Sequence, residues 1–264
     1  MAAMLRIAIA TAAALTFLAG CQEPGTAEIA RGNVLASRGQ YEEAITSYKA
    51  AAAAAPKSAR PLELLGHLLA DRGRGAEARE AYRQAVQLQP ADSLEARLGL
   101  AKLDAAEGKL DEAVAELTSV LEQQKGNLFA LLSRAQLELK RGKPGDVEAA
   151  LQDTAQAMMV DQKNAAVLYT RGLAFLAASQ PGQAAEAFAL LEKAHPKSPL
   201  WAYGQAKVAM AKGDQAGALD GLRQARERAA PESGWSAQDV RKDPAFAPLK
   251  DDPAFAAALG ETGK

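Results

Sequence analysis

The sequence predicts an all-α fold, a solenoid of about six antiparallel helix hairpins that ends in a short helical cap. Two observations favour this fold. Apolar residues make up 48% of the 264 residues but aromatic residues only 5%, because alanine, the best helix former, supplies about half of the apolar count. A spacing of 34 residues recurs along the chain, and glycines and prolines recur at fixed places within it. A β fold would instead require many Val, Ile, Thr and aromatic residues.

The N-terminal residues have the parts of a secretory signal. Arg6 precedes an uncharged apolar run over residues 7–18, which is followed by the small residues Ala19 and Gly20. A helix of this run would rise about 18 Å, less than the ~30 Å hydrocarbon core of a bilayer. We therefore expect residues 1–20 to be an export signal and not a permanent membrane span.

The four residues Leu18-Ala19-Gly20-Cys21 resemble a bacterial lipobox. The resemblance implies cleavage before Cys21 and lipid transfer to its thiol, which leaves residues 21–24 as the lipidated N-terminus and a short linker. The alternative is that Cys21 is a small apolar residue near an ordinary cleavage site. Because Cys21 is the single cysteine, an intramolecular disulfide framework is excluded.

The lipid determines the predicted location, the bacterial cell envelope. The lipoprotein pattern implies three acyl chains, and two or more anchor a protein stably. Gln22 follows the cysteine, and by the enterobacterial sorting pattern a residue other than Asp here indicates the outer membrane, facing the periplasm. The inner membrane remains an alternative.

Internal similarity organises residues 25–230 into six units: 25–58, 59–92, 94–127, 128–164, 165–198 and 199–230. The second and fifth units show the pattern most completely, through Leu62, Leu65, Gly66, Leu69, Ala78, Tyr82, Ala85 and Pro90, and through Leu168, Gly172, Phe175, Ala184, Phe188, Leu191 and Pro196. This pattern resembles the tetratricopeptide repeat, a helix–turn–helix unit of 34 residues. The resemblance implies a right-handed superhelix with a concave groove.

The residue types explain the spacing. Small residues such as Gly66 and Ala78 allow the two helices of a hairpin to cross closely, and larger ones such as Tyr82 and Phe188 fill the space between hairpins. Glycines that end the first helices favour a left-handed conformation, namely Gly39, Gly73, Gly108, Gly142 and Gly213. The fourth unit is longer, and we expect its three extra residues in the interhelix turn, around residues 143–145.

Residues 231–264 depart from the repeat. Asp243 and Asp252 each precede a proline, an arrangement typical of a helix start with aspartate as the N-cap. We predict two or three short helices that cover the open end of the last hairpin. The alternative is that Phe246, Leu249 and Phe255 occupy the groove.

No constellation for chemistry is found, and we expect neither an enzyme nor a cofactor. The formal net charge of −1 lacks the basic excess of a nucleic-acid-binding protein. The two histidines, His67 and His195, lack the spacing of a metal site and are interpreted as surface residues. Nucleophile-elbow, phosphate-loop and dinucleotide-binding motifs are absent, so no small-molecule substrate is expected.

The groove is the remaining candidate site. In the tetratricopeptide fold, which this sequence resembles, set positions of each first helix face the groove. In the later units these positions form a mostly apolar strip: Phe129, Leu132, Gln136, Leu139, Tyr169, Leu173, Leu176, Tyr203 and Lys207. An apolar patch that no core needs indicates a binding surface. The alternatives are a tail that covers the strip and a register that is wrong by one position.

The expected function is a lipid-anchored, periplasm-facing adaptor that binds envelope proteins through the groove and the membrane through Cys21, and supports assembly of an envelope complex. The sequence resembles pilotins and the repeat lipoproteins of exopolysaccharide and exosortase systems. The alternatives are a self-associating structural lipoprotein and, third, an accessory subunit of an enzyme. Partner identity and oligomeric state are left open.

Overall fold

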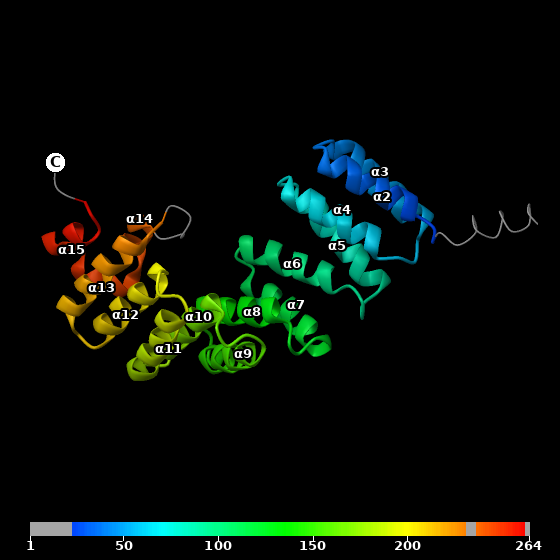
Figure 1. Ribbon diagram of the computed structural model, residues 1–264. Helices are drawn as coiled ribbons and strands as arrows, with labels where there is room; N and C mark the ends of the chain where they lie inside the picture. Colours follow the sequence, from blue (N-terminus) through cyan, green and yellow to red (C-terminus); the bar gives the residue numbers. More distant parts are fainter. Residues whose placement is uncertain (1–22, 231–235, 262–264) are drawn as a thin grey trace, which may run out of the picture. The chain divides into compact units, whose positions relative to one another are not determined.

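The computed structural model describes residues 23–230 and 236–261, in which every regular element is a helix (Figure 1). The all-α prediction, with consecutive helix hairpins, is confirmed. The predicted export signal and Cys21 lie outside the described residues. The chain divides into two compact units, Met1–Glu107 and Gly108–Lys264, and each is described by itself.

Over residues 23–107, the described part of the first unit, there are two hairpins and a further helix. The helices are α2 (Thr26–Ser37), α3 (Tyr41–Ala54), α4 (Arg60–Asp71), α5 (Gly75–Leu88) and α6 (Leu94–Ala106). Helices α2 and α3 pair, as do α4 and α5, and α6 packs against α5. Buried side chains from α3 to α6 form one apolar core.

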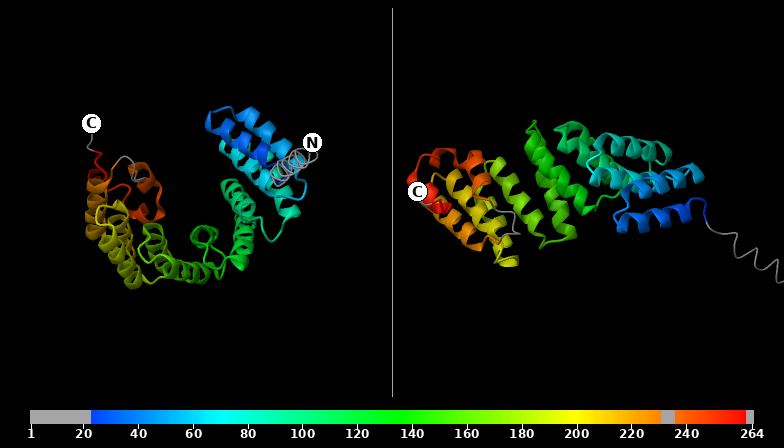
Figure 2. Two further views of the ribbon diagram at one scale, coloured as in Figure 1. Left: turned by 45° about the vertical axis from the view of Figure 1, so that its right-hand side comes forward. Right: turned by 90° about the horizontal axis from the view of Figure 1, so that it is seen from above.

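The second unit contains α7 (Leu110–Gln123), α8 (Leu128–Arg141), α9 (Asp146–Val160), α10 (Ala165–Ala177), α11 (Pro181–Ala194), α12 (Pro199–Ala211) and α13 (Gln215–Arg228). Each helix packs against the next, and the first helices α8, α10 and α12 also contact one another in order. Figures 1 and 2 show these hairpins stacked from green to orange. The two helices of the predicted unit 94–127 therefore belong to different compact units, α6 to the first and α7 to the second.

A ring clamped between glycines joins successive hairpins. A Cβ on Gly66 would lie 2.5 Å from Tyr82 Cε1, and one on Gly99 of the next first helix 2.4 Å from Tyr82 Cζ. Phe188 is held in the same way, because a Cβ on Gly172 or Gly204 would approach its ring to 2.4 Å. Because a real Cβ does not approach a ring so closely, these glycines are the space that each ring fills.

The turns within hairpins depend on a left-handed residue. Gly73 has φ 74°, and the other four glycines predicted to end first helices also have positive φ. In the fifth predicted unit, Ser179 takes this role with φ 58°, although a non-glycine residue is strained there. The sequence did not indicate this exception.

The extra residues of the long fourth unit, 128–164, do not all lie where the sequence predicted. The turn between α8 and α9 has four residues, 142–145, against three, 178–180, between α10 and α11. Helix α8 has 14 residues and α9 has 15, one more each than the 13 of α10 and the 14 of α11. The prediction that all three residues enter the turn is therefore wrong, because each helix takes one. Arg141 and Asp146, which face each other across the turn at 2.5 and 2.9 Å, stabilise the extended ends.

The C-terminal residues form the predicted cap from α14 (Ala237–Lys242), the 3₁₀ helix η2 (Pro244–Leu249) and α15 (Pro253–Ala258). Asp243 and Asp252 accept hydrogen bonds from the backbone N–H groups two residues ahead, as N-caps do. Phe246 and Phe255 are fully buried in one cluster with apolar residues of α12 and α13. The cap therefore covers the last hairpin.

Candidate functional site

The predicted strip lies on three adjacent first helices of the second unit, α8, α10 and α12. Phe129, at the start of α8, is 56% exposed. Gln136 is also exposed, and its amide Nε2 donates to Thr170 Oγ1 at 3.2 Å, which links α8 to α10. The other members are half-buried: Leu132, Leu139, Tyr169, Leu173, Leu176, Tyr203 and Lys207.

A cavity of about 640 Å³ occupies the C-terminal part of this strip. Four predicted residues line it, together with neighbours on α10 and α12 and with residues of the cap. The lining residues are Leu139, Leu173, Leu176, Ala177, Lys207, Met210, Ala211, Asp243, Pro244, Ala245 and Pro248. The cavity falls in the range of ~300–1,000 Å³ that is typical of ligand pockets. The other five predicted residues do not line it: Phe129, Leu132, Gln136, Tyr169 and Tyr203.

The cap reaches the strip through Asp243. Its carboxylate lies 2.6 Å from Lys207 Nζ and accepts a hydrogen bond from the Tyr203 hydroxyl. Burial works against ionisation of Asp243, but these hydrogen bonds hold the pKa of its carboxyl below the usual value. Burial first, and then the hydrogen bond to Asp243, raises the pKa of the Tyr203 hydroxyl.

The two roles considered for the tail are combined in the structure. Phe246, Leu249 and Phe255 are buried against the last hairpin, as in a cap. Tyr203, however, is covered, because the Phe246 ring lies 5.7 Å from its own ring, centroid to centroid. The cavity beside Lys207 is left open. Sequence reasoning missed Asp243, Pro244 and Pro248 as lining residues, since no repeat offset extends to the tail.

In the first unit, polar side chains of α2 and α4 form hydrogen bonds with tyrosine hydroxyls of α3 and α5. The Tyr48 hydroxyl donates to Asn33 Oδ1 at 2.8 Å, and the Tyr82 hydroxyl lies 2.9 Å from His67 Nδ1. Burial lowers the pKa of His67. Both histidines are half-buried, so neither is fully exposed at the surface, and His195 bonds through Nε2 to the Lys163 carbonyl.

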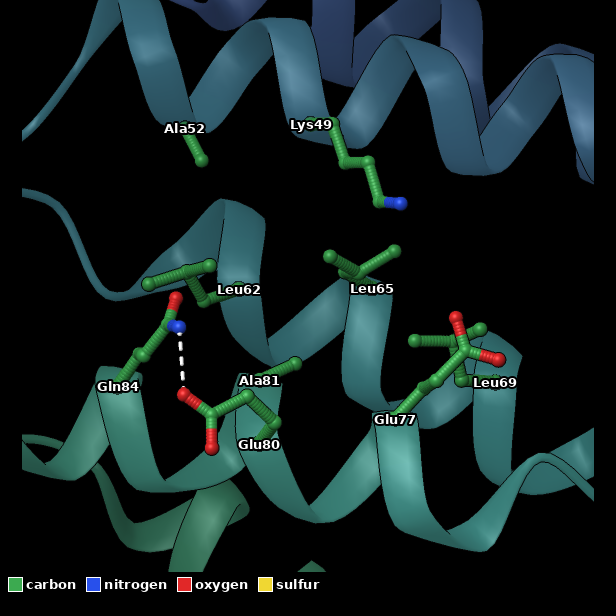
Figure 3. Close-up of a pocket in the computed structure, with 9 residues that line it drawn as sticks. All are labelled: Lys49, Ala52, Leu62, Leu65, Leu69, Glu77, Glu80, Ala81 and Gln84. Carbon is green, nitrogen blue, oxygen red and sulfur yellow. Dashed lines mark hydrogen bonds between the residues drawn. The ribbon is translucent and has the colours of Figure 1, made fainter.

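The first unit has a smaller cavity of about 340 Å³ among α3, α4 and α5 (Figure 3). Its floor is formed by Leu62, Leu65 and Leu69, and polar side chains such as Lys49 and Glu77 stand at its rim. This cavity contains no residue of the predicted strip.

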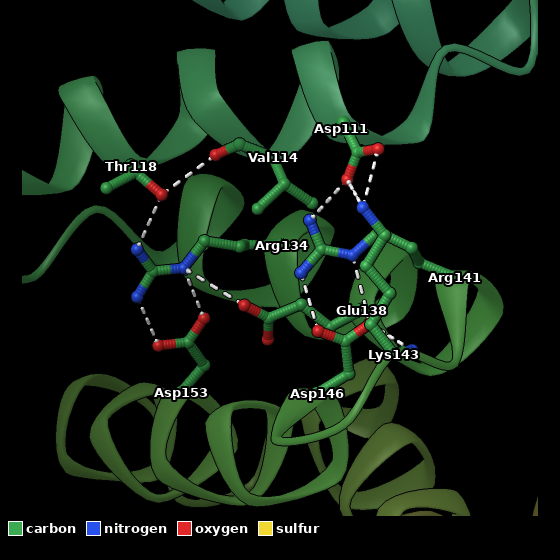
Figure 4. Close-up of polar contacts among 9 residues, drawn as sticks. All are labelled: Asp111, Val114, Thr118, Arg134, Glu138, Arg141, Lys143, Asp146 and Asp153. Atoms are coloured by element: carbon green, nitrogen blue, oxygen red, sulfur yellow. Dashed lines mark hydrogen bonds and ion pairs between the residues drawn. The ribbon is translucent and has the colours of Figure 1, made fainter.

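Buried charges between α7, α8 and α9 were also missed (Figure 4). Arg134 binds Asp153 through two hydrogen bonds of 2.7 Å, and Glu138 lies 3.9 Å from Arg134 with its other oxygen buried and without a partner. Burial, and then the nearby Asp153 charge, raises the pKa of Glu138 to about 7. The sequence contained a sign of these buried charges. Arg134 and Glu138 stand at repeat positions that are occupied by the apolar residues Leu65 and Leu69 in the second repeat, 59–92.

Neither a metal site nor a membrane-spanning helix is present among the residues that the structure describes. Within residues 23–230 and 236–261, no group of three or more His, Cys, Asp and Glu residues is arranged to hold a metal ion. None of the helices described there combines the length and apolar character needed to cross a membrane.

Two tetratricopeptide-repeat families match the sequence, one at residues 29–93 and 169–233 and the other at residues 69–137. Together these segments cover more than half of the chain. The chain belongs to the tetratricopeptide repeat family. Tetratricopeptide folds are generally non-catalytic scaffolds that bind protein partners. No curated protein matches the sequence.

Solved tetratricopeptide structures share the fold. A tetratricopeptide repeat protein from Parabacteroides merdae is 18% identical, with a TM-score of 0.72 over 89% of this chain and 90% of that chain. Pseudomonas aeruginosa pilF is 14% identical, with a TM-score of 0.61 over 83% of this chain and 96% of that chain. YrrB, described as a TPR protein with an unusual peptide-binding site, is 16% identical, with a TM-score of 0.60 over 70% and 93%. At these identities the similarity shows the fold alone.

Proposed function

We propose that this tetratricopeptide repeat protein is a lipid-anchored adaptor of the bacterial envelope that binds a segment of a partner protein on α8, α10 and α12. The cavity carries the proposal, because it brings Leu139, Leu173, Leu176 and Lys207 to one place on the face predicted to bind. The described peptide-binding site of YrrB supports a similar use of this fold.

A leucine pair on neighbouring helices tests the binding face. Leu173→Glu places a charge in the cavity, whereas Leu190→Glu places the same charge on α11 at a side chain that is already 49% exposed. Crosslinking and mass spectrometry in the native host should show a partner with the wild type and with Leu190→Glu, and lose it with Leu173→Glu. Equal partner recovery from both variants contradicts the site. A loss of helicity in Leu173→Glu would instead assign that side chain to the core.

The membrane anchor is the second part of the proposal. It rests on the lipobox-like sequence that ends at Cys21 and on the start of α2 at Thr26. The four residues between them reach about 14 Å when extended, which would hold the first hairpin near the membrane. Such an anchor favours partners that are themselves at or near the membrane.

Cys21→Ser tests the anchor. It should move the protein from the membrane pellet to the soluble fraction, or leave unprocessed precursor. A variant that is processed normally and still pellets after a high-salt wash would show that lipid on Cys21 is not the anchor.

The third part of the proposal is the envelope pathway in which the protein acts. The sequence resemblance favours an escort role like that of pilotins, or a role beside exopolysaccharide or exosortase machinery, in the outer membrane and facing the periplasm. The masses of the crosslinked partners distinguish these roles. Flotation of the anchored protein in a sucrose gradient distinguishes the outer from the inner membrane.

A further inference from the structure

The cap does more than cover the last hairpin, because one side of it faces the cavity. Pro244, Ala245 and Pro248 of η2 line the cavity together with Leu173 and Met210 of the repeat helices. Both prolines are exposed, whereas Phe246 and Leu249 of the same short helix are buried in the cap core. The two sides of η2 therefore have separate roles, one in packing and one in lining.

Several contacts hold this wall in position. Asp243, directly before η2, is bound by Lys207 Nζ at 2.6 Å and by the Tyr203 hydroxyl, and it also caps η2 by accepting from Ala245 N at 3.0 Å. The Phe246 ring of η2 also packs on the Tyr203 ring, with the two centroids 5.7 Å apart. A wall held in this way exists before a partner arrives, so binding need not order it.

The charges around the cavity indicate what it accepts. Lys207 and Asp243 are the charged residues among those that line it, and they neutralise each other. Pro244 and Pro248 have no backbone N–H to donate. A charged ligand group would therefore be desolvated without a free counter-charge, whereas apolar groups would bury against leucine, methionine and proline side chains.

We propose that the C-terminal cap is one wall of the binding site, and that η2 together with α10 and α12 holds an uncharged apolar segment of a partner protein. This inference rests on the cavity of the proposed function and adds to it a role for the tail and a partner chemistry. Pro244 and Pro248 are positioned to determine specificity, and the Lys207–Asp243 pair positions them.

The test compares charges at two exposed positions of η2, one that lines the cavity and one that does not. Pro248→Asp places a carboxylate in the wall, and Ala247→Asp places one on the adjacent exposed residue that does not line the cavity. Leu173→Asp charges the opposite wall. The probe is the neutral dye N-phenylnaphthylamine, titrated by fluorescence into the full chain carrying Cys21→Ser, so that the N-terminal segment contributes equally in every arm.

Pro248→Asp and Leu173→Asp should each weaken dye binding about tenfold or more, and Ala247→Asp should change it less than about twofold. If Pro248→Asp resembles Ala247→Asp while Leu173→Asp weakens binding, the tail is not a wall and this inference fails, although the proposed function stands. If none of the three weakens binding, the cavity is not a site and both fail. Pro244→Asp, at the first position of η2, replaces Pro248→Asp if that variant melts early.

Partner chemistry is tested by displacing the dye with three capped peptides that are identical except for one central residue: Leu, Asp or Lys. The leucine peptide should displace the dye at the lowest concentration. Better displacement by the aspartate peptide would mean that a ligand carboxylate replaces Asp243 on Lys207, which overturns the proposed chemistry. Sedimentation provides the remaining outcome: if the wild type dimerises and Pro248→Asp is monomeric, a second copy fills the cavity and the partner assignment is overturned.

Discussion

Replacing Glu138 by glutamine should make the protein more stable at alkaline pH and nearly unchanged at acidic pH. Glu138 is only 5% exposed, and its Oε2 is buried without a hydrogen-bond partner. The groups around it are Arg134 and Arg141 on its own helix and Asp146 and Asp153 on α9 (Figure 4). Arg134 binds Asp153 at 2.7 Å but lies 3.9 Å from Glu138. Arg141 is engaged by Asp146 at 2.5 and 2.9 Å, so the charge of Glu138 is poorly compensated.

The raised pKa of Glu138 determines whether stability rises or falls with pH. Burial and the Asp153 charge raise the pKa of Glu138 from 4.5 to about 7, so the folded state holds a proton that the unfolded state has released. Below pH 4.5 both states are protonated and stability is unaffected. Stability is lost as pH rises from 4.5 to 7, and the loss is complete above that window. The full cost is about 3 kcal/mol at most, because each tenfold change in proton affinity corresponds to about 1.4 kcal/mol.

Glu138→Gln keeps the shape of the side chain but removes the ionisation. Urea unfolding followed by circular dichroism at pH 5 and pH 8 should show a gain of about 1–3 kcal/mol at pH 8 and little change at pH 5. Glu122→Gln is the matched control, since Glu122 is exposed on α7, and it should leave both values unchanged. If Glu138→Gln and wild type have parallel stabilities across this pH range, the side chain ionises as freely as in water and the reasoning about its burial is wrong.

Further predictions concern the turns, the clamped rings and the cap. Ser179→Gly should stabilise the protein by up to about 1 kcal/mol, and Gly73→Ala should destabilise it by about 1–2 kcal/mol, because the left-handed conformation strains a residue that has a side chain. Urea unfolding in which Ser179→Gly lowers the free energy of unfolding and Gly73→Ala raises it would refute this. Tyr82→Phe should cost about 1 kcal/mol through loss of the hydroxyl contact with His67, and Tyr82→Ala about 3–5 kcal/mol through the cavity between hairpins, measured by thermal melts. Phe246→Ala should likewise cost about 3–5 kcal/mol, and a native-like melting temperature would show that the cap packs loosely.

Short-range patterns in the sequence were sufficient for the hairpins. Gly66 and Tyr82 lie 16 residues apart in one unit, and the Tyr82 ring fills the space left by the missing side chain of Gly66 when the two helices pair. The Asp-Pro starts at Asp243 and Asp252 are local in the same sense, because an N-cap needs only the backbone of the next residues. Periodicity and capping therefore predicted the helices, the repeat and the existence of a cap.

Contacts between residues far apart in the sequence could not be predicted from these patterns. The Tyr203 hydroxyl and the Asp243 carboxylate are separated by 40 residues, and no repeat offset relates a tail to a repeat helix. Whether Glu138 finds a partner depends on the distances from both arginines to the aspartates of α9, which a helix pattern does not contain. The sequence by itself determined the fold, because propensity and periodicity act between near neighbours, and it predicted an apolar strip on the first helices. Only the tertiary structure decided that the tail lines the cavity and that one oxygen of the Glu138 carboxylate is buried without a hydrogen-bond partner, because these depend on how distant segments meet in space.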